Sequence, residues 1–371
     1  MNFTQADHDY MAMAIALAKQ GFNTTTPNPN VGCVIVKEGE IVGQGFHVQA
    51  GGPHAEVFAL REAAEQARGA TAYVTLEPCS HYGRTPPCAK GLIDAGVSKV
   101  ICAMVDPNPE VAGNGLKMLQ QAGIETASGL LEQEARALNK GFLKRMEHGL
   151  PYVVAKLAAS LDGKTALQNG KSKWITGPDA RRDVQAFRAK SCAILSGADT
   201  VLTDNARLNV RAEELPNLTP AQDSVDVRQP LRIIIDTQNR LLPSLALFES
   251  HSKVIILRSK LDNQHNWPHF VEQVCLPTIN NKLDLKAVLS FLASRDINLV
   301  WLEAGATLCG VMHEQGLIDE YIVYFAPKII GDDGKGLFKS HMLTEMDQIQ
   351  ELQITDCTQV GNDIRISAIK K

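Results

Sequence analysis

The chain has 371 residues, which exceeds the size that one hydrophobic core usually supports, so two or three domains are expected. Hydrophobic residues make up 44% of the chain and charged residues 21%. Both values are typical of folded globular proteins and exclude general disorder. The formal net charge is −4 and no basic block stands out, which argues against a nucleic-acid partner because phosphate binding needs a Lys/Arg surface.

Composition also bears on where the protein works. No apolar run approaches the ~20 residues that a membrane-spanning helix needs, so no membrane partner is expected. The N-terminus lacks the basic region of a signal peptide, and Asp7 and Asp9 precede its apolar part. Eight scattered cysteines in a chain of this length do not resemble a disulfide framework. We therefore expect a cytoplasmic enzyme with reduced thiols.

The first part of the chain predicts alternating helices and strands. Its N-terminal helix carries Met11, Ala14, Ile15 and Ala18 on one face, and Gly21 ends it. The segments that follow are a hairpin over 31–36 and 41–48, a helix over 54–67, a strand over 71–78, a helix over 88–96, a strand over 99–105, a helix over 115–123, a strand over 124–129 and a single helix over 131–149. This alternation favours a mostly parallel sheet covered by helices on both faces.

A Gly-Leu-Pro junction follows this α/β layer and predicts a boundary between domains 1–149 and 150–371. In the second domain a helix over 176–190 is expected, with Thr176 as its N-cap and Pro178 in its first turn. The polar, Pro-punctuated segment 212–229 predicts an exposed loop. The other expected elements are strands over 149–160, 192–198, 231–236, 253–258, 297–303 and 320–330 and a helix over 283–294.

One histidine and two cysteines in the first domain have the residue types of a zinc site. His54, Cys79 and Cys88 supply one nitrogen and two sulfurs, which leaves a fourth tetrahedral position for water, as in catalytic zinc sites. Zinc lowers the pKa of such a water toward neutrality. Glu56 is the candidate catalytic residue, because a carboxylate that does not bind the metal can carry protons to a leaving amine. This is the H-x-E…P-C…C pattern of zinc nucleobase deaminases.

The spacing of these residues imposes conditions on the site. Eight residues separate Cys79 from Cys88, whereas zinc-binding cysteines usually lie two to four residues apart. Positions two apart on an ideal helix point about 200° apart, so His54 must lie at the very start of its helix for Glu56 to reach the same metal. The remaining cysteines are interpreted mostly as core side chains, namely Cys33, Cys102, Cys192, Cys275, Cys309 and Cys357.

The stretches TTTPNPNVGCVIV, GGPHAEVFAL and TLEPCSHYGRTPPC resemble the bacterial bifunctional deaminase–reductases of riboflavin biosynthesis. The long Cys–Cys loop is typical of that family and distinguishes it from tRNA and cytidine deaminases. The resemblance implies a cytidine-deaminase-like three-layer αβα domain with one zinc ion per chain. It further implies that the pyrimidine nucleotide is held by Asn28, His47, Glu77, His81 and Arg84. An arginine in a loop beside the metal also suits a substrate phosphate on chemical grounds.

The second domain lacks a strand-linked G-x-G-x-x-G, so a standard dinucleotide-binding fold has no support. It resembles the reductase domain of the same family through AKLAASLDGKTA, GKSKWITGPDAR, GADTVLTDNARLNVR, IIIDTQNRLLP and LVWLEAGATL, which implies a dihydrofolate-reductase-like α/β fold. The implied NADPH contacts are Ala158, Trp174, Thr200, Asp204, Thr237 and Gly305. The implied contacts with the ribosyl substrate are Lys156, Ser172, Arg188, Leu208, Arg211 and Glu303.

Two local features accompany this resemblance. Residues 303–307, EAGAT, lie between a predicted strand and a predicted helix, whose free N–H groups can receive the cofactor pyrophosphate. Ala304 stands where the family usually has a glycine, and its methyl group restricts close approach of the backbone. No sequence argument identifies the proton donor that accompanies hydride transfer, and Asp204 is taken as the candidate.

The sequence thus predicts a two-step enzyme. Zinc-dependent hydrolysis would deaminate 2,5-diamino-6-ribosylamino-4(3H)-pyrimidinone 5′-phosphate, and NADPH would then reduce its ribosyl group to give 5-amino-6-ribitylaminouracil 5′-phosphate. The resemblance also implies a homodimer formed through the reductase domain. Two alternatives stay open: a deaminase for another base with an unrelated second domain, and a non-catalytic binding module with a structural zinc. A structural site would need four protein ligands, and three are evident.

Overall fold

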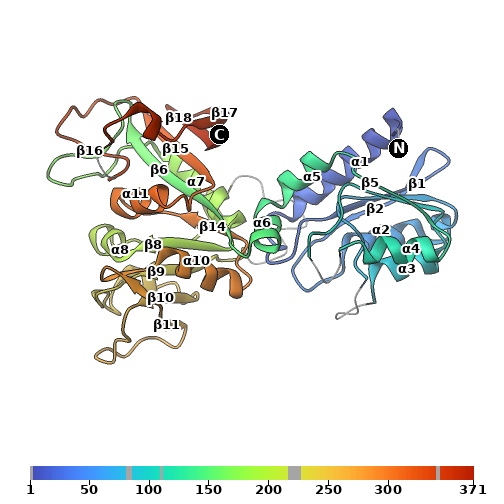
Figure 1. Ribbon diagram of the computed structural model, residues 1–371, viewed down its shortest axis with the longest axis horizontal. Coiled ribbons are helices and arrows are strands. Elements are labelled where there is room, and N and C mark those ends of the chain that lie inside the picture. Colours follow the sequence, from blue (N-terminus) through green and yellow to red (C-terminus); the bar gives the residue numbers. More distant parts are fainter. Residues whose placement is uncertain (1–2, 81–85, 109–111, 216–226, 340–342) are drawn as a thin grey trace. The chain divides into compact units, whose positions relative to one another are not determined.

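The computed structural model describes residues 3–80, 86–108, 112–215, 227–339 and 343–371. The chain forms two compact units, which meet in the sequence between Gly149 and Leu150. Each unit is built around its own β-sheet (Figure 1). Below, they are called the N-terminal unit and the C-terminal unit.

The N-terminal unit contains a five-stranded sheet with the order β2-β1-β3-β4-β5. The first two strands form the predicted antiparallel hairpin, and β3, β4 and β5 run parallel to one another. The bounds are β1 Gly32–Lys37, β2 Glu40–Phe46, β3 Thr71–Val74, β4 Lys99–Cys102 and β5 Glu125–Ser128. The helices are α1 Gln5–Ala18, α2 Ala55–Ala63, α3 Cys88–Ala95, α4 Asn114–Gln121, α5 Glu132–Leu138 and α6 Lys140–His148, and short 3-10 turns η1 Lys19–Gly21 and η2 Ala64–Ala67 follow α1 and α2.

Helices cover both faces of this sheet, because successive strand residues point to opposite sides. Val34 and Val36 of β1 belong to a core that includes the buried face of α1 and residues of α5 and α6. Cys33 and Ile35 belong to a second core with residues of α2, α3 and α4. The three-layer αβα arrangement is therefore confirmed, as is the predicted apolar face of α1.

Two glycines in β2 bring α2 close to the sheet. A Cβ atom at Gly43 would lie 2.2 Å from the carbonyl oxygen of Ala59, and one at Gly45 would lie 2.5 Å from the Cβ of Phe58. Any side chain at these positions would push α2 away from the strand. Since α2 begins next to His54, this close packing sets where the histidine lies.

The single helix predicted over 131–149 is wrong. The structure has two helices there, α5 and α6, separated at Asn139, whose φ of −125° is not helical. The Asn139 side chain accepts a hydrogen bond from the Asn30 backbone N–H at 2.7 Å and donates one to the Asn30 carbonyl at 2.9 Å. This bidentate contact with a segment 109 residues away competes with helical hydrogen bonding, which explains the break.

The C-terminal unit contains a nine-stranded sheet with the order β11-β10-β9-β8-β14-β6-β15-β18-β17. Strands β11 to β15 in this order run parallel, whereas β18 and β17 are antiparallel additions. The bounds are β6 Tyr152–Ser160, β8 Ala193–Gly197, β9 Leu231–Ile235, β10 Val254–Arg258, β11 Val271–Cys275, β14 Leu299–Leu302, β15 Glu320–Ala326, β17 Leu352–Val360 and β18 Asp363–Lys370. Two small ladders pair β7 Lys164–Ala166 with β16 Lys335–Gly336 and β12 Thr278–Ile279 with β13 Lys282–Leu283.

Helices again lie on both faces of this sheet. Val153 and Ala155 of β6 join one core, which includes residues of α10 and α11, and Val154 joins the other, which includes residues of α7 and α8. The helices are α7 Pro178–Lys190, α8 Ala198–Asp204, α10 Leu285–Ser294 and α11 Ala306–Glu314, with 3-10 turns η3 Ala212–Glu214, η4 Ala246–Phe248 and η5 Met346–Gln348. The predicted α/β class of the second domain is therefore confirmed.

The start of α7 differs from the prediction. The N-cap of α7 is Gly177 rather than Thr176, and Asp363 of β18 accepts a hydrogen bond from the Gly177 N–H at 2.7 Å. A tertiary contact thus decides where the helix starts.

Most of the predicted loop 212–229 lies outside the described residues. The hairpin of β17 and β18, for which no element was predicted, adds two strands to the sheet.

In the part of the chain that the structure describes, no helix is long and apolar enough to cross a membrane.

All eight cysteines are free thiols, and six of them lie at buried or half-buried positions. Cys275 and Cys357 are exposed, so the expectation that they are core side chains is wrong. Both lie on strands near the edges of the large sheet, where one side of a strand has no covering layer.

Candidate metal centre and reductase site

The three predicted metal ligands lie at the ends of secondary-structure elements. His54 is the N-cap of α2 and has an extended backbone, with φ −77° and ψ 168°. Cys88 is the first residue of α3. Cys79 lies in the segment after β3 and accepts a hydrogen bond from the Cys88 backbone N–H through its sulfur, at 3.3 Å. The condition that His54 precede the regular helix is therefore met, and its side chain leaves the helix in a different direction from an ideal helical residue.

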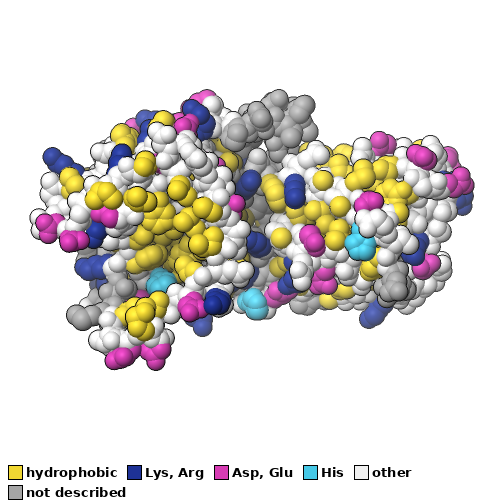
Figure 2. Space-filling view, turned by 90° about the horizontal axis from the view of Figure 1, so that it is seen from above, with side chains coloured by type: hydrophobic (Ala, Val, Ile, Leu, Met, Phe, Trp, Pro, Cys, Tyr) yellow, Lys and Arg dark blue, Asp and Glu magenta, His cyan; other side chains and the backbone are white. Residues whose placement is uncertain are grey.

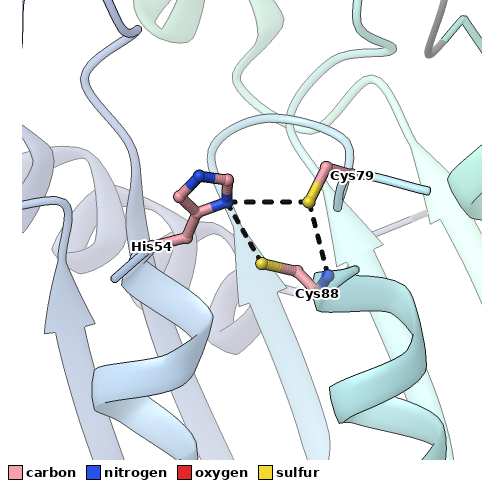
Figure 3. Close-up of side chains that lie close together, drawn as sticks. All are labelled: His54, Cys79 and Cys88. Carbon is pink, nitrogen blue, oxygen red and sulfur yellow. Dashed lines mark hydrogen bonds between the residues drawn. The ribbon is translucent and has the colours of Figure 1, made fainter. Parts of the chain in front are cut away.

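These side chains converge on one point (Figure 3). The Nδ1 atom of His54 lies 3.2 Å from the Cys88 sulfur and 3.6 Å from the Cys79 sulfur. All three potential ligand atoms lie within 4.8 Å of one another. The same ring nitrogen thus faces both sulfurs, as expected for three ligands of one tetrahedral ion.

Mutual hydrogen bonds set the protonation of the trio, and the one between the two cysteines raises the pKa of the Cys88 thiol well above its usual range. Hydrogen bonds from Cys88 and His54 lower the pKa of the Cys79 thiol to about 4, although burial opposes them. The hydrogen bond to Cys79 raises the pKa of His54. Cys79 is therefore held as a thiolate, which is the form that binds metals.

Glu56 lies beside the trio and is buried, with 3% of its surface exposed. Burial raises its pKa, the charge of His54 lowers it and the thiolate of Cys79 raises it again. Within the described residues, its buried oxygen Oε2 makes no hydrogen bond. A buried carboxylate oxygen without a partner is unfavourable unless something else binds there. The geometry thus leaves Glu56 available for a water or a substrate group.

Asn28 and His47, both predicted to contact the nucleotide, lie next to this trio. The Asn28 amide donates to His47 Nε2 at 3.2 Å, and His47 Nδ1 donates to the Pro53 carbonyl at 2.9 Å. The ring of His47 lies edge-on to that of His54, with centroids 5.5 Å apart. Burial lowers the pKa of His47, so the neutral ring is the favoured form.

The other three predicted nucleotide contacts in this unit have different outcomes. His81 and Arg84 lie outside the described residues. Glu77 is described and is buried, with 3% of its surface exposed. Its carboxylate accepts hydrogen bonds from the backbone N–H groups of Asp106, Gly113, Gly115 and Leu116. Its contact with substrate stays a prediction.

In the C-terminal unit, Arg188 and Glu303 form a two-pronged ion pair. Arg188 Nε donates to Glu303 Oε1 at 2.6 Å, and its second nitrogen donates to Oε2 at 2.8 Å. The indole N–H of Trp301 also donates to Oε1, at 2.7 Å. Burial raises the pKa of Glu303, but the charge and hydrogen bonds of Arg188 outweigh burial and lower it to about 2.

Trp301 is a residue that the sequence interpretation missed. Position 301 lies on β14 and position 303 directly follows that strand, so in an extended chain their side chains share one face. That spacing is a signal that could have identified it. Its ring is buried and stacks on Phe187 of α7, with centroids 5.1 Å apart. Trp301 therefore helps to fix the Glu303 carboxylate.

Lys156 of β6 lies close to this ion pair. Burial lowers the pKa of its amine, while the charge of Glu303 raises it and that of Arg188 lowers it. Asp204, at the end of α8, also favours its charged form. The structure thus brings together three predicted residues with complementary charges, Lys156, Arg188 and Glu303.

Several predicted cofactor and substrate contacts follow the carboxyl ends of strands in the large sheet. Strands β9, β8 and β14 are parallel neighbours, and Thr237, Thr200 and Glu303 follow their carboxyl ends. Gly305 is the N-cap of α11, and a Cβ atom built on it would have no neighbour within 4 Å. Ala304 packs against the apolar core. The carboxyl ends of the strands in a parallel α/β sheet are where ligands ordinarily bind.

The remaining predicted residues are spread over neighbouring segments. Trp174 is 65% exposed, and the guanidinium of Arg181 lies 4.5 Å from its ring centroid. Arg211 forms an ion pair with Glu214 at 2.9 Å. Leu208 is buried in the core. Ala158 and Ser172 are half-buried.

Comparisons with known proteins agree with this two-part organisation. Residues 4–104 match the family model of the cytidine and deoxycytidylate deaminase zinc-binding region, and residues 151–366 match that of the RibD C-terminal domain. The riboflavin biosynthesis protein RibD of Haemophilus influenzae is 52% identical over 100% of this chain and 99% of its own. That of Escherichia coli is 51% identical over 96% and 98%. The chain belongs to the RibD family.

Solved structures of the RibD family extend the likeness to the whole fold. Acinetobacter baumannii RibD is 46% identical and superimposes with a TM-score of 0.90, covering 99% of both chains. A Thermotoga maritima deaminase–reductase is 33% identical, with a TM-score of 0.86 and 99% of both chains covered. The chain is thus a bifunctional enzyme of riboflavin biosynthesis with a hydrolytic deaminase domain and a reductase domain. Both predicted fold classes are confirmed, and a binding module without catalysis is excluded.

Proposed function

We propose that the N-terminal unit hydrolyses the amino group from C2 of a diaminopyrimidinone ribonucleotide 5′-phosphate and that the C-terminal unit then reduces its ribosyl group with NADPH. The observation that carries the first step is the convergence of His54, Cys79 and Cys88 beside Glu56. The Thermotoga relative is described as a diaminohydroxyphosphoribosylaminopyrimidine deaminase and 5-amino-6-(5-phosphoribosylamino)uracil reductase, which supports this substrate and this order.

The donor set of the trio fits zinc. One imidazole nitrogen and two sulfurs match its preference, and three protein ligands leave a position open. We propose that His54, Cys79 and Cys88 hold one zinc ion per chain, which supplies Lewis acidity that makes a water nucleophilic near neutral pH. The unpartnered oxygen of Glu56 supports this assignment, because a water or substrate amine would satisfy it.

Glu56 carries protons in this proposal. Its pKa is raised toward the working pH, which helps the carboxyl group both to accept and to release a proton there. It would accept a proton from the attacking water and deliver it to the departing amine. Asn28 and His47 would hold the pyrimidine, since Asn28 hydrogen-bonds to His47 and the His47 ring lies 5.5 Å from that of His54.

In the C-terminal unit, we propose that NADPH binds along the carboxyl ends of β9, β8 and β14, where it supplies a hydride. The open N-terminus of α11 at Gly305 would receive its pyrophosphate. Arg188 and Glu303 hold each other, and no hydrogen bond or ion pair within the described residues engages the Lys156 amine. Lys156 is therefore the cation left to contact the ribosyl substrate.

We also propose that the protein is cytoplasmic, in keeping with its free thiols.

We further propose that the protein forms a homodimer through the C-terminal unit. The edge strand β17 is exposed along most of its length. Figure 2 shows hydrophobic side chains gathered on this unit. An edge strand with exposed apolar residues ordinarily has a partner. The exposed apolar residues of this region are Leu343, Met346, Ile349, Leu352, Ile354 and Ile364. Ile354→Lys is expected to shift sedimentation from dimer to monomer.

The test of the catalytic proposal uses the purified full chain. Bound zinc is measured first, then ammonia release from the diaminopyrimidinone ribonucleotide, then NADPH oxidation with the deaminated product. We expect about one zinc per chain, ammonia release without NADPH, and NADPH oxidation only after deamination. Ammonia released only from a different pyrimidine would overturn the substrate assignment. Oxidation of NADH as fast as NADPH would overturn the cofactor assignment.

A further inference from the structure

The Glu77 carboxylate, two residues before the metal ligand Cys79, is fully occupied by the protein itself. Its Oε1 accepts from the backbone N–H groups of Gly115 at 2.9 Å and Leu116 at 3.2 Å. Its Oε2 accepts from those of Gly113 at 2.9 Å and Asp106 at 3.2 Å. A carboxylate offers about four acceptor positions, so these four donors saturate it. No acceptor position is left for a substrate group.

Three of these donors belong to the start of α4. Gly113 is the N-cap of that helix and cannot provide a side-chain cap, so the first N–H groups have no local acceptor. Glu77 supplies that acceptor from another part of the chain. Its negative charge also interacts favourably with the positive end of the helix dipole. The start of α4 and the segment that carries Cys79 are therefore tied together by one side chain.

Packing reinforces this tie. A Cβ atom at Gly115 would lie 1.9 Å from the carbonyl oxygen of Pro78 and 3.2 Å from Glu77 Oε1. The backbone of α4 thus contacts the peptide group directly before Cys79, and only glycine allows that approach. On its other side, the carbonyl of Cys79 accepts from the Ala89 N–H of α3 at 3.2 Å. Cys79 is clamped between the starts of two helices.

We propose that Glu77 is a positioning residue of the metal centre: it fixes Cys79 through α4 and does not contact the nucleotide. The inference rests on the proposed zinc site and deepens it. It replaces the substrate contact implied by family resemblance with a role in placing one ligand. Residues that orient a metal ligand typically change metal affinity or activity about 10–100-fold when they are replaced.

Two variants test the role from independent sides. Glu77→Gln keeps the shape but leaves one acceptor oxygen and turns an NH2 donor toward two backbone donors. Gly115→Ala keeps glutamate at position 77, but its methyl group forces the backbones of α4 and Pro78 apart. Glu62→Gln is the matched control for the first, because the Glu62 carboxylate accepts from a single backbone N–H, that of Gln44 in β2. Gly91→Ala in α3 is the control for the second, since its Cβ would meet only a methyl group of Leu60 in α2, at an ordinary contact distance of 3.6 Å.

The readouts are zinc affinity by chelator competition, the absorption spectrum of the cobalt-substituted protein, and kcat and KM for deamination. For Glu77→Gln and Gly115→Ala we expect zinc affinity to fall about tenfold or more, the cobalt–thiolate absorption to change and kcat to fall. KM should stay within about twofold of wild type, and both controls should match wild type. NADPH oxidation by the other unit verifies the amount of folded protein.

Two results would overturn the inference. One is unchanged zinc affinity with a raised KM in Glu77→Gln, which would make Glu77 a substrate contact. The other is wild-type behaviour of both variants in every readout. If Glu77→Gln does not fold, Gly115→Ala decides alone by the same criteria. Wild-type protein that binds no zinc would instead contradict the proposed function, so the two failures are distinguishable.

Discussion

Glu56 and Glu303 are both largely inaccessible glutamates in predicted sites, yet their environments act in opposite directions. Burial raises the pKa of Glu56, and its oxygen Oε2 has no partner within the described residues. Glu303 is half-buried, and Arg188 holds both of its oxygens and lowers its pKa to about 2. The first carboxylate is suited to exchanging protons, and the second is suited to a permanent charge.

The two units also assemble their sites differently. In the N-terminal unit, residues 54–88 supply all three proposed metal ligands and the proposed proton carrier from two helix starts and the segment after β3. In the C-terminal unit, Lys156, Arg188 and Glu303 come from β6, α7 and the end of β14, and the sheet order brings them together. The first site is thus a local motif, whereas the second depends on topology.

The largest expected effect is on Glu56. Glu56→Ala should lower the rate of deamination about 10²–10⁴-fold, the usual contribution of a general acid–base group, while zinc stays bound. NADPH oxidation with the deaminated product should not change. Ammonia assays with metal analysis check both statements. Deamination retained near the wild-type rate would remove Glu56 from the proposed role.

The next effect concerns the ion pair of the C-terminal unit. Arg188→Met leaves the half-buried Glu303 carboxylate without its partner, and the cost of breaking a fully buried pair, about 3–5 kcal/mol, is the upper limit of the expected loss. We expect unfolding of this unit at lower urea concentration and loss of NADPH oxidation. Deamination serves as the internal control. Arg182→Met, which removes a surface pair with Asp179, should change stability by less than about 1 kcal/mol.

The low pKa of Glu303 predicts a pH dependence of stability. Because the folded-state value of about 2 lies below the ordinary 4.5, the charged pair stabilises the fold above about pH 4.5. That stabilisation, about 3 kcal/mol, is lost as pH falls from about 4.5 toward 2. Urea unfolding of the C-terminal unit between about pH 6 and pH 3 measures it. Glu303→Gln should flatten this dependence, and an equally steep slope in that variant would contradict the assignment.

The smallest effect concerns Asn139 in the N-terminal unit. Asn139→Ala removes both hydrogen bonds to the half-buried Asn30 backbone, and the cost of leaving fully buried groups unpaired, about 1–3 kcal/mol, is the upper limit of the expected loss. Thermal unfolding should show this loss in the deaminase unit alone. Asn114→Ala, at an exposed position that starts α4, is the matched control and should be nearly neutral. Equal effects of the two substitutions would mean that the Asn139 contact does not hold the break between α5 and α6.

Much of the fold followed from local patterns. The apolar face of α1, the hairpin of β1 and β2 and the alternation of strands and helices were all predicted, because periodicity and turn residues act over a few positions. The grouping of His54, Cys79 and Cys88 was predicted because zinc chemistry admits few ligand types. Whether they bind zinc stays a prediction.

Other features depended on contacts between distant segments, which no local pattern contains. Asn139 breaks a helix because Asn30 lies beside it, and Asp363 decides where α7 starts. Trp301 contacts Glu303 only once β14 is placed in the sheet. Glu77 shows the difference most clearly: family resemblance implied a substrate contact, but four backbone N–H groups donate to its oxygens. Residue types alone limit which chemistry is possible, whereas packing settles which of their polar atoms stay available, because packing sets their hydrogen-bond partners.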